Sequence, residues 1–253
     1  MGDEARTRGR GNAVTRVGAS APGKALLCGE YAVLDGAPAV VAAVDRRVVV
    51  EWSDDAQPMP PEVVATLERA RARFGDVADT GYLSIDANAL RRDDVKLGLG
   101  SSAAGAVASA GAVFASHGED ISDPHIVQQV FECAFEGHAA VAPSGSGVDV
   151  AASAFGGFLC FERTSDVRTR TLGRPDDLVI RLVWTGRAAR TSDLVAQVRE
   201  LQRNEPEAYE THMTMLATLA KSFADTFERG LAGEVVRLAD EYGAAMGLSL
   251  IHI

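Results

Sequence analysis

Cysteine, lysine and long hydrophobic runs are scarce in this sequence of 253 residues. The three cysteines, Cys28, Cys133 and Cys160, have no C-x-x-C or other metal-ligand spacing, and their odd number argues against a disulfide framework. No stretch is apolar enough to span a membrane, and residues 1–16 lack the apolar centre of a secretory signal. These absences predict a protein of the reducing cytoplasm with no membrane partner, whose residues 1–16 form a disordered leader.

Positive charge is in short supply as well. The formal net charge is −10, which excludes bulk attraction to nucleic acid, so an anionic ligand needs a local cationic site. Lys24, Lys96 and Lys221 are the only lysines among 25 basic residues. Two of them stand beside glycine-rich turns, which either marks anion sites or is a coincidence.

Glycine and serine are concentrated in Lys96–Ala104, which reads KLGLGSSAA. This stretch predicts a tight loop before a helix of small residues over Ala103–Ala115, with Ser101 or Ser102 as the N-cap. The free N–H groups and the dipole of such a helix start bind anions, phosphate above all. The stretch lacks the lysine of a Walker A loop, and by itself it fits a phosphate site and an unliganded loop about equally well.

Two further glycine-containing stretches carry charged residues. In the first, Pro22-Gly23 ends an expected strand over Val17–Ala21, and Lys24 and Glu30 read either as functional groups or as solvated surface residues. In the second, Asp149 opens an apolar segment after a Gly-Ser-Gly turn. An aspartate there serves either the chemistry of a site or, more commonly, as a helix cap.

The order of the expected elements predicts the α+β class, because a strand-rich part to about residue 185 precedes a helical part. The expected helices are Glu62–Phe74, Ala103–Ala115, Pro124–Gly137, Leu194–Arg203, Glu207–Arg229 and Gly233–Ala245. The later expected strands are Arg47–Trp52, Gly81–Ile85, Phe158–Phe161 and Val179–Trp184. This layout predicts one domain over 17–185 and a partial, helical domain over 186–247.

Together these stretches resemble the GHMP kinases, the superfamily named for galactokinase, homoserine kinase, mevalonate kinase and phosphomevalonate kinase. Ala21–Tyr31 is similar to the first motif of the family, and Lys96–Ala104 to its second, the Gly-Leu-Gly-Ser-Ser phosphate loop. The resemblance covers about Ser20 to Val195. It implies the GHMP kinase fold, with a ribosomal-protein-S5-domain-2-like N-terminal domain.

The resemblance also implies ATP and Mg²⁺ as cofactors and assigns roles to residues. Asp149 would orient or deprotonate the acceptor oxygen, while Lys24 would offset charge at the transferred group and keep Asp149 ionised. Ser102 and Glu136 are the implied magnesium ligands. The implied ATP-binding residues are Lys96, Gly98, Leu99, Gly100, Ser101, Ser102 and Ala103. The implied acceptor-binding residues are Gly145, Ser146, Gly147, Thr185, Gly186, Thr191 and Ser192.

Within the family the chain is most similar to the phosphomevalonate kinase branch, which implies transfer of the ATP γ-phosphate to 5-phosphomevalonate. Lys96, Gly145–Ala152 and Trp184-Thr185-Gly186 carry this similarity, although Val141-Ala142-Pro143 replaces the usual Gln-Gly-Lys. Mevalonate kinases instead have a magnesium-binding glutamate where this chain has His138. Mevalonate kinase or another GHMP small-molecule kinase is the alternative, and an inactive GHMP-like fragment or binding protein is the alternative of another class.

The end of the chain lacks the third glycine-rich motif of the family. Leu248–Ile253, which reads LSLIHI, matches the translated end of a transposon used to prepare sequencing libraries. We therefore expect native sequence to end near Gly247 and interpret residues 248–253 as an artefact. The expected partner is a small-molecule substrate. The sequence leaves open the acceptor, the activity of this chain and whether it forms a homodimer.

Overall fold

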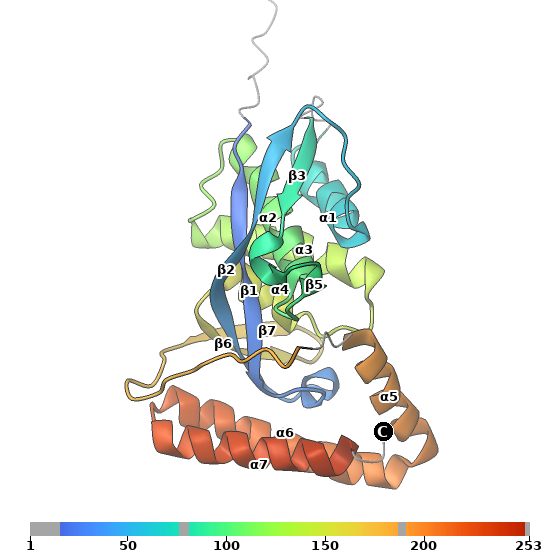
Figure 1. Cartoon of the computed structure of the whole chain (residues 1–253), viewed down its shortest axis with the longest axis vertical. Helices are drawn as coiled ribbons and strands as arrows, with labels where there is room; N and C mark the ends of the chain where they lie inside the picture. The colour runs from blue at the N-terminus through green and yellow to red at the C-terminus, as the bar shows by residue number, and fades with distance from the viewer. Residues whose placement is uncertain (1–15, 76–80, 187–190, 251–253) are drawn as a thin grey trace, which may run out of the picture.

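The computed structural model describes residues 16–75, 81–186 and 191–250, in which a sheet stands between two groups of helices (Figure 1). The sheet is antiparallel, with the strand order β1-β2-β6-β7 and with β3 paired to the far end of β2. Its strands are β1 (Ala19–Cys28), β2 (Ala39–Ser53), β3 (Tyr82–Asp86), β6 (Phe158–Arg163) and β7 (Val167–Leu172). A separate hairpin consists of β4 (Arg91–Arg92) and β5 (Val95–Lys96).

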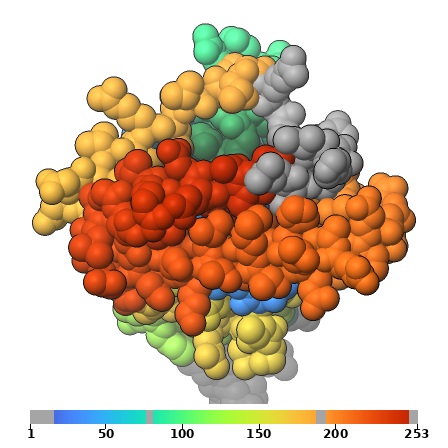
Figure 2. Space-filling model, turned by 90° about the horizontal axis from the view of Figure 1, so that it is seen from below, coloured from blue at the N-terminus to red at the C-terminus, as the bar shows by residue number. Residues whose placement is uncertain are grey.

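Seven helices within the described ranges cover the sheet. Four of them pack on one face: α1 (Pro61–Ala72), α2 (Ser101–Ser116), α3 (Pro124–Val141) and α4 (Val148–Phe155). The other three are α5 (Thr191–Asn204), α6 (Pro206–Glu228) and α7 (Ala232–Leu250). Figure 2 shows α6 and α7 lying side by side across one end of the molecule. None of the helices within the described ranges is long and apolar enough to cross a membrane.

The first half of β2 is buried on both of its faces, which explains its unbroken apolar run. Because successive side chains of a strand point to opposite faces, Ala39 and Val41 enter the core under α1–α4. Val40 enters a second core, in which Phe223 and Phe227 of α6 cover the opposite face. The sheet therefore joins the two groups of helices through two apolar layers.

The α+β class is confirmed, but β1 does not end at Pro22-Gly23 as the sequence predicted. Proline is tolerated because β1 lies at the edge of the sheet and its register with β2 shifts between Pro22 and Lys24. The N-cap of α2 is Gly100, without a side-chain cap, so neither Ser101 nor Ser102 has the predicted capping role.

The strand predicted at Val179–Trp184 is wrong, and β7 takes the place beside β6. Residues 179–184 are apolar but hydrogen-bond to no strand within the described ranges, and Val183 is 86% exposed. β7 consists mainly of arginine and threonine and is exposed along most of its length. Its pairing with β6 places it in the sheet, and its composition gives no hydrophobic signal.

The contact between α1 and α3 depends on Gly137. A Cβ at this position would lie 2.6 Å from the backbone nitrogen of Thr66. We expect Gly137→Ala to lower the free energy of unfolding by about 1–3 kcal/mol, because the two helices would have to move apart. Gly243→Ala is the matched control, since that helical glycine has no neighbour within 4 Å. It should stabilise the protein by about 0.5–1 kcal/mol, and equal urea denaturation midpoints for the two variants would contradict the packing argument.

Candidate active site

The first and second motifs meet at β1. The Lys24 amide donates a hydrogen bond to the Leu99 carbonyl oxygen over 2.8 Å, which ties β1 to the glycine loop. A Cβ on Gly23 would lie 2.5 Å from the same Leu99 oxygen and 2.7 Å from Cδ2 of Leu90. The contact therefore requires glycine at position 23, and it brings Lys24 to the start of α2.

The glycine loop leaves the first turn of α2 open to an anion. Gly100 has a φ of +75°, and the aliphatic part of Lys24 lies against it, with Cγ 2.9 Å from where a Cβ would be. Ala104 donates to the Gly100 carbonyl, whereas the preceding helical amides have no partner in the described residues. These amides belong to Ser101, Ser102 and Ala103. Free amides, a helix dipole and a neighbouring lysine are groups suited to binding a phosphate.

More positive charge lies just before this loop, on the β4–β5 hairpin. Lys96 is exposed at the end of β5 and pairs in register with Arg91. The Arg92 guanidinium lies 5.7 Å from the centroid of the Trp184 ring, so the hairpin contacts the segment before Thr185 and Gly186. Thr185 and Gly186 are exposed. Arg187 and Arg190 lie outside the described residues, as do the side chains of Thr191 and Ser192.

The structure brings His138, not Glu136, to the serine expected to bind magnesium. The Oγ of Ser102 lies 3.5 Å from Nε2 of His138. Glu136 is turned toward α1, where its carboxylate pairs with the Arg69 guanidinium at 3.3 Å. No cluster of three or more His, Cys, Asp or Glu side chains within the described ranges is arranged to hold a metal ion. Of the two predicted ligands, Ser102 therefore has the better position to bind a metal that a nucleotide carries in.

Asp149 occupies the first turn of α4 but does not cap the helix. The N-cap is Gly147, and the Asp149 carboxylate accepts a hydrogen bond from the Val150 amide over 3.1 Å. Within the described residues, neither an ion pair nor a hydrogen bond joins Asp149 to Lys24. That Lys24 keeps Asp149 ionised as a nearby opposite charge stays a prediction.

The Gly-Ser-Gly turn before Asp149 is fixed by two contacts. A Cβ on Gly147, whose φ is +86°, would lie 2.2 Å from the Phe135 ring, so a side chain is excluded there. The Arg163 guanidinium donates to the carbonyl oxygens of Gly145, at 2.8 Å, and Ser146, at 3.2 Å. Sequence reasoning missed Arg163, because an arginine at the end of a strand carries no motif.

The sequence left Glu30 open as either a functional group or a solvated surface residue. It follows β1 in a tight turn, and its Oε2 is buried without a hydrogen-bond partner. The Tyr242 hydroxyl of α7 donates to the Glu30 carbonyl oxygen over 2.7 Å. Burial raises the pKa of Glu30 above 4.5, and its own amide and the charge of Lys24 offset part of this effect.

Comparisons with known proteins agree with this geometry. Residues 62–157 match the family model of the GHMP kinases N terminal domain. A mevalonate kinase of Aeropyrum pernix is 30% identical over 263 residues, covering 93% of this chain and 78% of that protein. A phosphomevalonate kinase of Streptomyces sp. is 27% identical over 299 residues, covering 88% and 79%. The chain belongs to the GHMP kinases, phosphotransferases that use ATP.

Solved structures confirm the predicted fold. The crystal structure of Streptococcus pneumoniae phosphomevalonate kinase aligns with a TM-score of 0.73 at 17% identity, covering 92% of this chain and 80% of that one. At this identity the likeness establishes the shared fold, and the chemistry of the site depends on the residues described above.

The buried Glu30 carboxylate predicts a pH-dependent stability. Since its pKa is raised in the folded state, the folded protein binds more protons than the unfolded chain above about pH 4.5, and the free energy of unfolding falls as pH rises. The loss is complete once the pH exceeds the folded pKa. Glu30→Gln should remove this slope, so the variant gains stability over the wild type with rising pH.

Urea denaturation of both proteins between about pH 4 and pH 8 measures this difference. Glu68→Gln, which changes an exposed carboxylate on α1, is the control and should run parallel to the wild type. A difference between wild type and Glu30→Gln that stays constant with pH would show that the carboxylate is not desolvated.

Proposed function

We propose that this protein is an ATP- and Mg²⁺-dependent kinase that transfers the γ-phosphate to 5-phosphomevalonate. The observation that carries the proposal is the contact of Lys24 with Gly100 at the open first turn of α2. Phosphoryl transfer needs positioned positive charge and hydrogen-bond donors around the phosphates more than it needs covalent chemistry. The amides, the helix dipole and Lys24 supply these at one place.

Each residue then has a physical task. The amides of Ser101, Ser102 and Ala103 would bind phosphate oxygens, and the Ser102 hydroxyl would hold a Mg²⁺ ion that arrives with the nucleotide. The ion would supply positive charge that neutralises the phosphates. Lys24 offsets the negative charge of the transferred group. Lys96 extends the positive charge on the hairpin side.

Asp149 serves the acceptor side of the site. Its carboxylate is held at the start of α4 by the turn that Arg163 and Phe135 fix. A phosphate oxygen of 5-phosphomevalonate needs little deprotonation near neutral pH, so Asp149 chiefly orients the acceptor. With an alcohol acceptor the same carboxylate would take the proton as general base.

The choice of acceptor is supported by His138. At the position beside Ser102 it supplies an imidazole in place of the glutamate that mevalonate kinases usually have. Mevalonate is the second candidate acceptor, favoured by the 30% identity to the Aeropyrum pernix mevalonate kinase. A protein that binds nucleotide without turnover is the candidate of another class.

We expect Asp149→Asn to lower kcat at least about a hundredfold, the lower end of what general-base or orienting carboxylates contribute. Stabilisation by Mg-ATP should persist in thermal melts, because the phosphate loop is untouched. Asp45→Asn is the control, an exposed aspartate on β2 that should leave kcat unchanged. Near-wild-type turnover by Asp149→Asn would remove Asp149 from the reaction.

The deciding experiment compares mevalonate with 5-phosphomevalonate as acceptor, with ADP release as the readout. The phosphate that distinguishes 5-phosphomevalonate from mevalonate can gain charge-assisted hydrogen bonds worth about 1.5–3 kcal/mol each, so two contacts predict a preference in kcat/KM of about a hundredfold or more. Faster turnover of mevalonate would overturn the assigned acceptor. Stabilisation by Mg-ATP without turnover of either acceptor would favour a binding protein or another GHMP substrate.

A further inference from the structure

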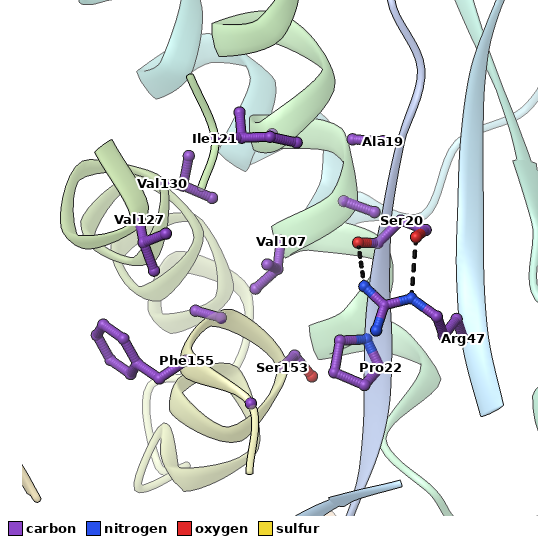
Figure 3. Close-up of a pocket in the computed structure, with 14 residues that line it drawn as sticks. Ala19, Ser20, Pro22, Arg47, Val107, Ile121, Val127, Val130, Ser153 and Phe155 are labelled. Atoms are coloured by element: carbon purple, nitrogen blue, oxygen red, sulfur yellow. Dashed lines mark hydrogen bonds between the residues drawn. The ribbon is translucent and has the colours of Figure 1, made fainter. Parts of the chain in front are cut away.

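We propose that a cavity beside the edge strand β1 binds a small aliphatic carboxylate. The cavity lies between β1, α2, α3 and the end of α4 and has a volume of about 310 Å³. Figure 3 shows the side chains that point into it from these elements. None of its lining residues belongs to the phosphate loop or to the Gly-Ser-Gly turn.

Most of the wall is apolar. Branched side chains of α2, of α3 and of the connection between them, with one phenylalanine of α4, form the side away from β1 (Figure 3). These residues are Val107, Ile121, Val127, Val130 and Phe155. Such a surface holds water poorly and favours a hydrocarbon body.

The side of the cavity next to β1 carries a buried donor that the protein leaves unused. Ser153 is 2% exposed, and its hydroxyl has no hydrogen-bond partner among the residues that the structure describes. In Figure 3 this hydroxyl points toward Pro22 and the β1 side of the cavity. Buried hydroxyls are nearly always hydrogen-bonded, so an unpartnered one in a cavity wall indicates a missing acceptor.

Arg47 supplies positive charge to the same side. Its Nε and Nη2 donate to the side chain and the carbonyl of Ser20, at 2.9 and 2.8 Å, which fixes the plane of the guanidinium. The third nitrogen, Nη1, has no partner among the described residues and lies beside Pro22 (Figure 3).

A fixed guanidinium edge and a hydroxyl donor are suited to a planar carboxylate. The apolar wall accommodates its hydrocarbon chain. The protein carries a net charge of −10, so its overall electrostatic field does not attract an anion. The positive charge that binds the carboxylate must therefore come from Arg47. The ligand class is therefore an aliphatic monocarboxylate small enough for this volume.

Isothermal titration calorimetry with octanoate, octan-1-ol and octylamine tests the proposal on the whole chain. We expect saturable one-site binding of octanoate, at least tenfold weaker binding of octan-1-ol and no binding of octylamine. Arg47→Met should weaken octanoate binding at least tenfold, whereas Arg168→Met, at an exposed arginine of β7, should leave it unchanged. Ser153→Ala should weaken it too, because it removes the hydroxyl donor without filling the cavity.

Thermal melts show whether each variant is folded, and Val107→Phe, which fills the cavity, should abolish binding. Equal affinity for octanoate and octan-1-ol, or undiminished octanoate binding in both Arg47→Met and Ser153→Ala, would overturn the carboxylate assignment. Absence of saturable binding of all three probes at millimolar concentration would overturn the site. Self-association that Val107→Phe abolishes would identify a second copy of the chain as the occupant instead.

Discussion

The approach of β1 to the Leu99 carbonyl is the contact on which the candidate active site depends. The contact is possible because Gly23 has no side chain. It places the aliphatic part of the Lys24 side chain against Gly100. Without this contact the lysine and the open turn of α2 would be two separate weak anion sites. With it, a lysine and a set of free amides lie at one place, where they could act on the same phosphate.

On the acceptor side of the candidate site, glycine again allows a close approach, here between the turn before α4 and helix α3. Gly147 lets the turn before α4 pack against Phe135 of α3, while the neighbouring Gly137 lets α3 approach α1. A single helix thus positions the turn that holds Asp149 and brings His138 to Ser102. Glycine at these contacts allows an approach that any side chain would prevent.

The glycine stretches could be read from the sequence because close backbone approach leaves a residue-type signal. The α+β class was predictable from the order of the expected strands and helices, and the resemblance to the family assigned Lys24 and the glycine loop to one site. The contact of Arg163 with the turn, the approach of His138 to Ser102 and the burial of the Glu30 oxygen depend on packing between segments distant in sequence, which leaves no local pattern. The wrong strand at Val179–Trp184 has the same origin, since apolar residues predict a strand and the pairing partner decides whether one forms.

The helices after residue 191 are part of the site's construction. Tyr242 of α7 holds the Glu30 carbonyl, and Arg199 of α5 pairs with Asp35 at 3.2 Å. The Tyr209 hydroxyl of α6 donates to the same aspartate. Burial of the tyrosine, together with this hydrogen bond, raises the pKa of Tyr209 to about 12. All three contacts hold the turn that follows β1. Because burying a carboxylate costs free energy, contacts that fix this turn favour the buried position of the Glu30 oxygen.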